Sequence, residues 1–376
     1  MLLSEDHQAV QDAVRQFVQA EITPHAAAWD KSGQFPAAQL RGLAALGCYG
    51  VAVPTEYGGA GLDYLALALM LEEIAAGDGA TSTIVSVNNC PVCSILMAFG
   101  NEDQKQRFLK PLARGDMLGA FCLTEPHVGS EAGGLKTSAV LDGDDYVLNG
   151  VKQFITSGKN GDVAIVMAVT EKAAGKRGIS AFLVSTTTPG YTVARVEDKM
   201  GQHASDTAQI LFDNCRVPAA NRIGDEGQGL KIALSGLEGG RIGIASQALG
   251  MARAAFEVAL AYSKDRQAFG VPIFQHQAVQ FKLADMATQI EATRQLIWHA
   301  ACLKDAGRPC LKEAAMAKLM ASEMAEAVCS GAIQVLGGYG YLSDFPVERI
   351  YRDVRVCQIY EGTSEVQKIL IGRALA

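Results

Sequence analysis

The chain has 376 residues, of which 49% are hydrophobic and 19% are charged, and its formal net charge at pH 7 is −7. This length predicts two or three globular domains with ample core. The acidic balance provides no basic field for holding nucleic acid, so we expect no nucleic-acid partner. No segment combines the length and apolar purity of a membrane span, so we expect no membrane insertion.

The first region, residues 1–117, has helical periodicity interrupted by Pro and Gly loops. Val10, Val14 and Val18 fall on one face of the opening helix. Cys90 and Cys93 form a CxxC pair, but no second pair lies nearby, and we interpret their segment as a packed helix. The nine cysteines favour buried free thiols, and the six dispersed histidines include no HxxxH, so no metal site is expected. Residues 1–117 are therefore predicted to form an N-terminal α-helical domain.

The pattern changes at residue 118 to short runs of Val, Ile, Thr and aromatic residues separated by turn formers. Asp142-Gly143 and Asn149-Gly150 both predict hairpin turns. Residues 118–225 are predicted to form a middle antiparallel β domain. Helical periodicity returns over residues 226–376, which predicts a C-terminal helical bundle. The fold class is thus α+β multidomain, and this order of elements argues against a doubly wound parallel sheet.

Several common nucleotide and nucleophile motifs are absent. No GxGxxG follows a strand, and the sequence contains no GxxxxGK[ST] and no GxSxG. These absences disfavour a nicotinamide-binding fold, phosphoryl transfer on a P-loop and α/β-hydrolase chemistry.

Polar, Gly-rich loops occur at the junctions between helical and β regions. "CLTEPHVGSEAG" offers hydroxyl groups and a flexible backbone to a flat ligand, "KQFITSG" places an aromatic ring beside a hydroxyl, and the Arg of "DRQAFGVPIFQHQ" could bind a phosphate. "QVLGGYGYL" is a Gly-rich helix end. Each has an ordinary structural alternative: a domain-entry loop, a plain strand, a solvent-facing Arg and a helix C-cap.

The segment "QIYEGTSEVQ" near the end of the chain carries an isolated acid. Ser364 and Gln367 fit the capping-box pattern, so we expect a helix to begin there with Ser364 as its cap. Glu361 then precedes the first turn, where a carboxylate is also favoured by the helix dipole alone.

Taken together, "TEPxxGS", "DRQAFG", "GGYGY" and "YRDxRVxQIYEGTSEVQ" resemble the acyl-CoA dehydrogenase family over essentially the whole chain. The resemblance implies an N-terminal helical domain, a middle β domain and a C-terminal four-helix bundle. It also implies bound FAD and a homotetramer whose subunits complete one another's flavin site. The family removes two hydrogens from an acyl-CoA to give the trans-2-enoyl thioester.

The resemblance assigns the catalytic base to Glu361. Certain relatives carry this Glu at the position of Gly240 instead, so Glu361 has no obvious rival here. Burial against substrate and flavin is expected to raise its pKa from the reference value near 4.3. Substrate contacts implied by the resemblance are Ser130, Glu238, Arg241 and Gly362. Implied FAD contacts are Phe121, Leu123, Thr124, Gly129, Ser130, Phe154, Thr156, Arg266, Phe269, His276, Gln277, Gln334, Gly337, Gly338, Thr363 and Glu365.

The substrate most consistent with "GGRIGIASQALG" and "YEGTSEVQ" is a short straight-chain acyl-CoA of the butyryl type. Isobutyryl-CoA is the nearest alternative, because one methyl group in an apolar pocket discriminates by only about 1–3 kcal/mol. An oxygen-reactive flavin oxidase or monooxygenase of the same fold and a flavin-free helical interaction protein are further alternatives. The expected electron acceptor is an electron-transfer flavoprotein. The expected location is the bacterial cytoplasm, or the mitochondrial matrix for a processed eukaryotic form.

Overall fold

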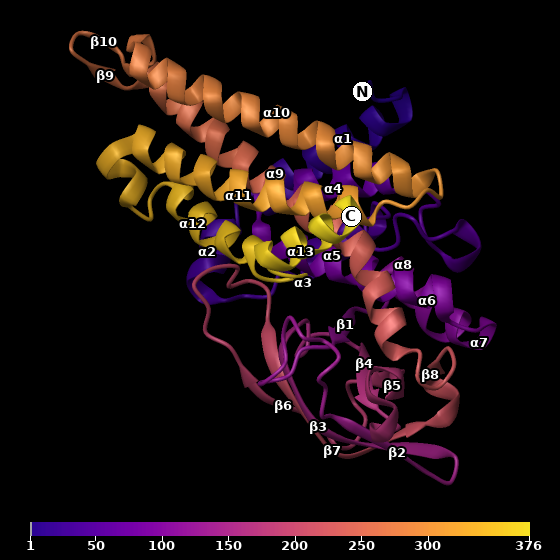
Figure 1. Cartoon of the computed structure of the whole chain (residues 1–376). Helices are drawn as coiled ribbons and strands as arrows, with labels where there is room; N and C mark the ends of the chain where they lie inside the picture. Colours follow the sequence, from indigo (N-terminus) through magenta and orange to yellow (C-terminus); the bar gives the residue numbers. More distant parts are fainter. Residues whose placement is uncertain (1) are drawn as a thin grey trace.

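The computed structural model describes residues 2–376 and arranges them as helices, then a sheet, then long helices (Figure 1). Several of the N-terminal helices begin at a capping side chain: Ser4 accepts the N–H of His7, and Asp63 accepts the N–H of Ala66. Their bounds are α1 (Glu5–Phe17), α2 (Ala26–Ser32), α3 (Ala37–Ala45), α4 (Tyr64–Gly77), α5 (Gly79–Val87), α6 (Ser94–Phe99), α7 (Glu102–Gln104) and α8 (Lys110–Arg114).

One N-terminal stretch, Gly79–Phe99, is long and apolar enough to cross a membrane by length and composition alone, and it is the one such stretch within residues 2–376. The expectation that no segment would qualify is therefore wrong in those terms. However, 72% of its apolar 18-residue window is buried, because the stretch packs inside the protein against α9 (Gly229–Asp265). It includes Cys90 and Cys93, which are buried free thiols in a π-helical turn, as expected for a packed helical segment.

The middle region is an eight-stranded sheet in the order β6-β7-β3-β2-β4-β5-β8, with β1 added beside β4. Its pairs are antiparallel except β1–β4 and β2–β4, which are parallel, so the predicted antiparallel domain is a mixed sheet. The bounds are β1 (Gly119–Cys122), β2 (Ser138–Asp142), β3 (Asp145–Thr156), β4 (Val163–Val169), β5 (Ile179–Ser185), β6 (Tyr191–Val196), β7 (Thr207–Pro218) and β8 (Arg222–Ile223).

Of the two predicted hairpin turns, only the first exists. Gly143, with φ +64°, lies in the turn that joins β2 to β3. Asn149-Gly150 lies inside β3, where the register against β7 shifts between Leu148 and Gly150. Gly150 has φ +151° and any Cβ there would overlap Thr137. The Asn-Gly pair therefore forms a bulge in a long strand, which glycine permits as readily as a turn.

The C-terminal region consists of three long helices and two short ones, with a small hairpin between the first two (Figure 1). The helices α9, α10 and α11 share one hydrophobic core, which also includes part of α4. The predicted domain boundaries, 117/118 and 225/226, fall in connections between elements and stay predictions. The bounds are α9 (Gly229–Asp265), β9 (Gln267–Ala268), β10 (Val271–Pro272), α10 (Gln277–Asp305), α11 (Leu311–Leu336), α12 (Pro346–Val354) and α13 (Ser364–Leu375).

Candidate active site

Glu361 lies in the connection that leads into α13. Its backbone is in the left-handed conformation, which residues other than glycine rarely adopt. Its φ is +53°, and that of Gly362 is +90°. A non-glycine residue in this region costs about 1–3 kcal/mol and persists only where its surroundings hold it. Gln367 provides part of that restraint, because its Nε2 donates to the carbonyls of Glu361 (3.1 Å) and Gly362 (2.9 Å). The strained turn therefore fixes the direction of the Glu361 side chain.

The start of α13 differs from the predicted capping box. The hydroxyl of Thr363, rather than that of Ser364, accepts the N–H of Val366. Ser364 instead donates to Glu323 on α11, at 2.6 Å. Gln367 turns back to the two carbonyls before the helix, so it does not complete a box. The pattern located the helix correctly but assigned its cap to the wrong residue, because both neighbours can serve as caps.

Glu361 is partly buried and its Oε2 is fully buried, and this desolvation raises the pKa of the carboxyl group to about 8. Arg241 on α9 and Lys318 on α11 act in the opposite direction and lower it. Within residues 2–376, Oε2 of Glu361 has no hydrogen-bond partner, and neither do Nε and Nη1 of Arg241. An acid in this state is a stronger base than an exposed glutamate, and its free oxygen is available to a ligand.

The glycine-rich side of α9 faces Glu361. Any Cβ at position 240 would overlap the Glu361 carboxylate, so a larger residue there would force the Glu361 side chain to move. One residue earlier, a Cβ at Gly239 would lie 3.1 Å from Sγ of Cys90 and 3.1 Å from the ring of Tyr64. The site thus lies where α9, the approach to α13 and the N-terminal helices meet. Gly240 is also the position at which the sequence resemblance placed the base of certain relatives.

The residues predicted to bind substrate are only partly brought together. Arg241 is buried with Glu361, and Gly362 is its chain neighbour. Glu238 is turned toward Lys304, whose Nζ is 3.1 Å from its Oε1, and toward Cys310. Ser130 is exposed on a loop of the β domain. The substrate roles of all four residues stay predictions.

A first group of predicted cofactor residues gathers at the end of β3. Phe121 is in β1, and Leu123 and Thr124 follow it. The buried Lys152 donates to the carbonyl of Leu123 (3.0 Å) and pairs with Glu125 (2.8 Å).

This loop is also bonded directly to β3. The N–H of Gln153 donates to the carbonyl of Thr124 at 2.8 Å. The loop, which continues to Gly129 and Ser130, is therefore fixed beside Phe154 and Thr156 at the end of β3. Phe154 is 63% exposed with φ +60°, so a large ring is presented to solvent at this edge.

A second group lies at the end of the C-terminal helices remote from the β domain (Figure 1). Phe269, at the tip of the β9–β10 hairpin, is 94% exposed, and its ring meets that of His276 edge-on. Gln277 begins α10, and Gln334 lies in the last turn of α11. Thr363 and Glu365 belong to neither group, because they lie at the start of α13.

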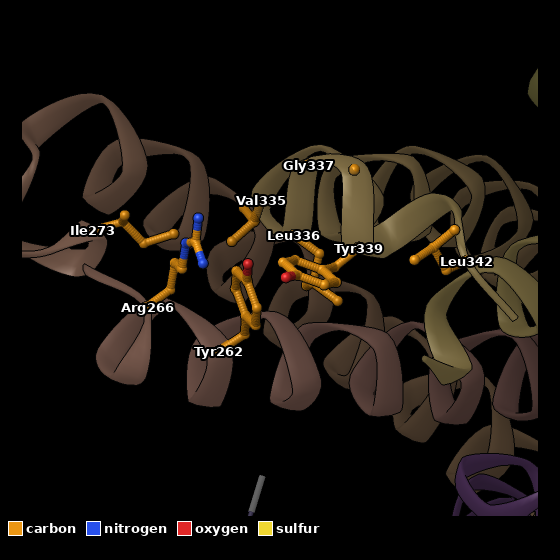
Figure 2. A pocket seen from close by; sticks show the side chains of 9 residues that line it. Tyr262, Arg266, Ile273, Val335, Leu336, Gly337, Tyr339 and Leu342 are labelled. Atoms are coloured by element: carbon orange, nitrogen blue, oxygen red, sulfur yellow. The ribbon is translucent and has the colours of Figure 1, made fainter. Parts of the chain in front are cut away.

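A pocket of about 540 Å³ lies in this second region. Figure 2 shows the side chains that line it. Arg266 lies 5.8 Å above the ring of Tyr339, and among residues 2–376 no carboxylate forms an ion pair with it. The lining residues include two that sequence reasoning did not single out, Tyr262 and Tyr339. The full lining is Tyr262, Arg266, Ile273, Val335, Leu336, Gly337, Gly338, Tyr339 and Leu342.

Comparison with known proteins agrees with this geometry. Models of the N-terminal, middle and C-terminal domains of acyl-CoA dehydrogenase match residues 4–116, 120–215 and 227–376. The chain belongs to the acyl-CoA dehydrogenase family. Members of this family are FAD-dependent oxidoreductases, and the predicted fold class is confirmed.

Three proteins similar to this family member illustrate the match. The mitochondrial short-chain specific acyl-CoA dehydrogenase of Homo sapiens is 49% identical over 98% of this chain and 90% of its own length. The butyryl-CoA dehydrogenase of Megasphaera elsdenii has a TM-score of 0.97 and 43% identity, covering 100% and 99% of the two chains. A chain in a structure of the electron transferring flavoprotein of Acidaminococcus fermentans has a TM-score of 0.98 and 45% identity, with coverage of 100% and 99%.

The family cofactor fits the residues present. Phe154 presents an exposed ring beside a hydrogen-bonded loop, which suits a flat heterocycle. A Cβ at Gly129, Gly337 or Gly338 would meet nothing within 4 Å, so the backbone at these positions is open to a ligand. Arg266 has no acidic partner among the described residues and suits a phosphate group.

Two functional candidates of this acyl-CoA dehydrogenase family member were missed in the sequence. Lys318 donates from Nζ to the carbonyl of Gly362 at 2.8 Å, and Gln367 restrains the same turn. A signal for Lys318 was present: Ala314, Ala317, Lys318 and Ala321 have the i, i+3, i+4, i+7 spacing of a buried helix face. A single lysine on such an apolar face is costly unless it has a specific partner. Gln367 carried no comparable signal, because glutamine is ordinary in a first helical turn.

Proposed function

We propose that this protein dehydrogenates a short straight-chain acyl-CoA to the trans-2-enoyl-CoA, with Glu361 as the base that removes the α proton. One observation supports the proposal. The carboxyl group of Glu361 has a raised pKa, and its buried Oε2 accepts no hydrogen bond from the described residues. A structural glutamate at a helix start would be exposed or paired with backbone N–H groups. Glu361 is neither.

The chain's own residues prepare this proton transfer in three ways. The left-handed turn at Glu361 and Gly362 fixes the direction of the carboxylate. Burial raises the basicity of the carboxylate toward the weakly acidic α proton of a thioester. Arg241 and Lys318 keep the ionised form accessible. FAD, when bound, supplies the acceptor for the hydride that leaves the β carbon.

We further propose that the FAD is held by the loop 121–130 and by Phe154 and Thr156 of one subunit, together with the Arg266, Phe269, His276 and Gly337 region of another. These two groups lie far apart within a single chain (Figure 1). Two copies of the chain could bring them together, which supports the expected homotetramer. Thr363 and Glu365 would contact the adenosine part.

The preference for a short acyl chain is supported by the close packing beside Glu361. At Gly236, one helical turn before Gly240, a Cβ would lie 2.7 Å from both Pro91 and Ile95. The two helical segments therefore approach closely and leave little depth for a long chain. The short-chain and butyryl-CoA names of the similar proteins agree with this preference. Isobutyryl-CoA differs by one branch and remains the nearest alternative.

The proposed electron acceptor is an electron-transfer flavoprotein, which the similar Acidaminococcus structure supports. The proposed location is the bacterial cytoplasm, or the mitochondrial matrix for a processed form, since the similar proteins include both bacterial and mitochondrial ones.

Anaerobic titration of the flavin with acyl-CoAs of graded length and branching tests the proposal. We expect butyryl-CoA to bleach the oxidised flavin band near roughly 450 nm at the lowest concentration. Isobutyryl-CoA should be weaker, and octanoyl-CoA weaker still. No bleaching by any acyl-CoA would refute the proposed reaction, and a preference for isobutyryl-CoA would replace its substrate. Rapid reoxidation of the reduced flavin by oxygen would favour the oxidase alternative.

A further inference from the structure

Lys318 lies beside the base on α11 and donates a hydrogen bond to Gly362, the residue that follows Glu361. Its side chain is 0% exposed, although α11 is otherwise lined on this face by alanines. Within residues 2–376, no carboxylate forms an ion pair with it. Among the same residues, its one hydrogen bond runs from Nζ to the carbonyl oxygen of Gly362, at 2.8 Å.

A lysine in this state is not explained by stability alone. Moving an ammonium group out of water is unfavourable, and burial lowers the pKa of Lys318 to about 8. An ion pair with an acid is the usual compensation, and here the compensation is a single backbone carbonyl. That carbonyl belongs to the turn at Glu361 and Gly362, both of which have positive φ. The buried ammonium group of Lys318 therefore stabilises the turn that orients the Glu361 side chain.

Two groups restrain the Gly362 carbonyl from different elements. Gln367, in the first turn of α13, donates to it at 2.9 Å, and Lys318 donates from α11 at 2.8 Å. Gln367 can move together with α13, since it belongs to the same local segment. Lys318 is anchored in a long helix of the bundle core, so it ties the turn to the rigid body of the protein.

We propose that Lys318 is a positioning residue for the dehydrogenation, an inference that rests on the proposed role of Glu361. Its ammonium group holds the Gly362 carbonyl, which keeps the Glu361 turn left-handed and aims the carboxylate past Gly240 into the site. As a cation it also favours the ionised form of the base. Lys318 touches neither the reacting atoms nor the cofactor, so it acts through Glu361.

The charged and titratable groups around Lys318 determine how its removal changes the pKa of Glu361. Glu361 and Cys357 face it from the segment before α13, Arg241 from α9, and Glu323 from α11 itself. Arg241 also lowers the pKa of Glu361, so removing Lys318 leaves one cation to oppose the effect of burial. The pKa of Glu361 should then rise further, and a smaller fraction of the base should be ionised near pH 7.5.

The test compares Lys318→Met, which removes both donor and charge, with Lys318→Gln, which keeps a donor. FAD content and the Kd for crotonyl-CoA are measured first, and then the stopped-flow rate of flavin reduction by butyryl-CoA as a function of pH. We expect the reduction rate per bound FAD to fall on the order of 10- to 100-fold in Lys318→Met. The ascending limb of its pH profile should move up by roughly one pH unit. Lys318→Gln should recover part of the rate but keep the shifted profile.

Lys199→Met is the matched control, because Lys199, although less deeply buried than Lys318, also donates from Nζ to a backbone carbonyl, that of Ser205. It should keep both the rate and the pH profile of the unmodified protein.

Should Lys318→Met fail to fold, Lys318→Gln alone decides the pH shift. A rate per FAD within twofold of the unmodified protein and an unmoved profile in the Lys318 variants would overturn the inference, with Glu361 still essential. If butyryl-CoA fails to bleach even the unmodified protein, the proposed function fails first and takes this inference with it.

Discussion

Two buried acidic clusters in this protein are built in opposite ways. Glu72 and Glu73 on α4 face Arg15, Arg253 and Arg294, and all four carboxylate oxygens accept hydrogen bonds at 2.7 to 3.4 Å. Glu361 has two cations nearby, yet its Oε2 has no partner among the described residues. The first cluster joins α1, α4, α9 and α10. The site around Glu361 leaves one carboxylate oxygen, Oε2, available to a ligand.

The contrast shows how a carboxyl group is made structural or reactive. A buried acid whose oxygens all accept hydrogen bonds from cationic side chains ties together the elements that carry those side chains. A buried acid that lacks such bonds becomes a stronger base, and the fold bears the cost. Variants in the two clusters should therefore affect different properties: stability in the Glu72 cluster and chemistry at Glu361.

The largest expected effect is on catalysis at Glu361. Glu361→Gln should keep FAD but lower the rate of flavin reduction by butyryl-CoA on the order of 1,000-fold or more, because an amide cannot accept the α proton. Stopped-flow bleaching of the flavin measures it. Glu257→Gln, an exposed change on α9, is the control. Bleaching by Glu361→Gln at the unmodified rate would show that another group is the base.

In the paired cluster the expected effect is on stability. Glu72→Gln should lower the free energy of unfolding by about 3 kcal/mol, because it leaves Arg294 without a buried counter-charge and removes one of the two that face Arg253. The rate of flavin reduction per bound FAD should stay unchanged. Urea unfolding followed by circular dichroism measures the loss, and Glu257→Gln should change stability by less than about 0.5 kcal/mol. A Glu72→Gln protein with unchanged stability and a lowered rate of flavin reduction would contradict the proposed difference between the two clusters.

The same substitution at Glu361 should have the opposite effect on stability. The pKa of Glu361 is raised from 4.5 to about 8 in the folded protein, so the folded state binds more protons than the unfolded state between these pH values. Its contribution to stability therefore decreases as pH rises from about 4.5 to about 8. At pH 7, Glu361→Gln should be more stable on the order of 2 kcal/mol, and near pH 4 the gain should vanish. The melting temperature of Glu361→Gln is compared with that of the unmodified protein at both pH values. The same difference at pH 4 and at pH 7 would contradict the pKa shift.

A smaller effect is expected at Gly240, which bounds the site. In Gly240→Ala the new Cβ overlaps the Glu361 carboxylate, so the side chain must turn away. The rate of flavin reduction should fall about tenfold with FAD retained. Gly372→Ala is the matched control, since a Cβ there meets nothing within 4 Å. An unchanged rate in Gly240→Ala would mean that the carboxylate is not confined as the structure shows.

Much of this architecture was predictable from the sequence, because periodicity and turn residues report local structure directly. The sequence of helical, β and helical regions and the helix at α13 follow from such patterns. The bulge at Asn149-Gly150 did not, because the same dipeptide suits a turn, and the choice depends on β7 pairing along the whole of β3. The cap of α13 was misassigned for a similar reason.

For the site, the motif around Glu361 identified the acid but not its environment. The raised pKa depends on burial of the carboxyl group, and two cations from distant segments, Arg241 and Lys318, partly oppose it. Such contacts depend on tertiary packing, which no local pattern encodes. The pairing of Lys152 with Glu125, which fixes the predicted cofactor loop, escaped prediction for the same reason.

The pH dependence of flavin reduction at limiting butyryl-CoA tests the central claim most directly, because this quantity reports ionisations of the free enzyme. If Glu361 is the buried base, the apparent second-order rate constant should rise with pH and reach half its maximum near pH 8. A profile that is flat above pH 6, with its half-maximum near the ordinary glutamate value of 4.5, would contradict the account.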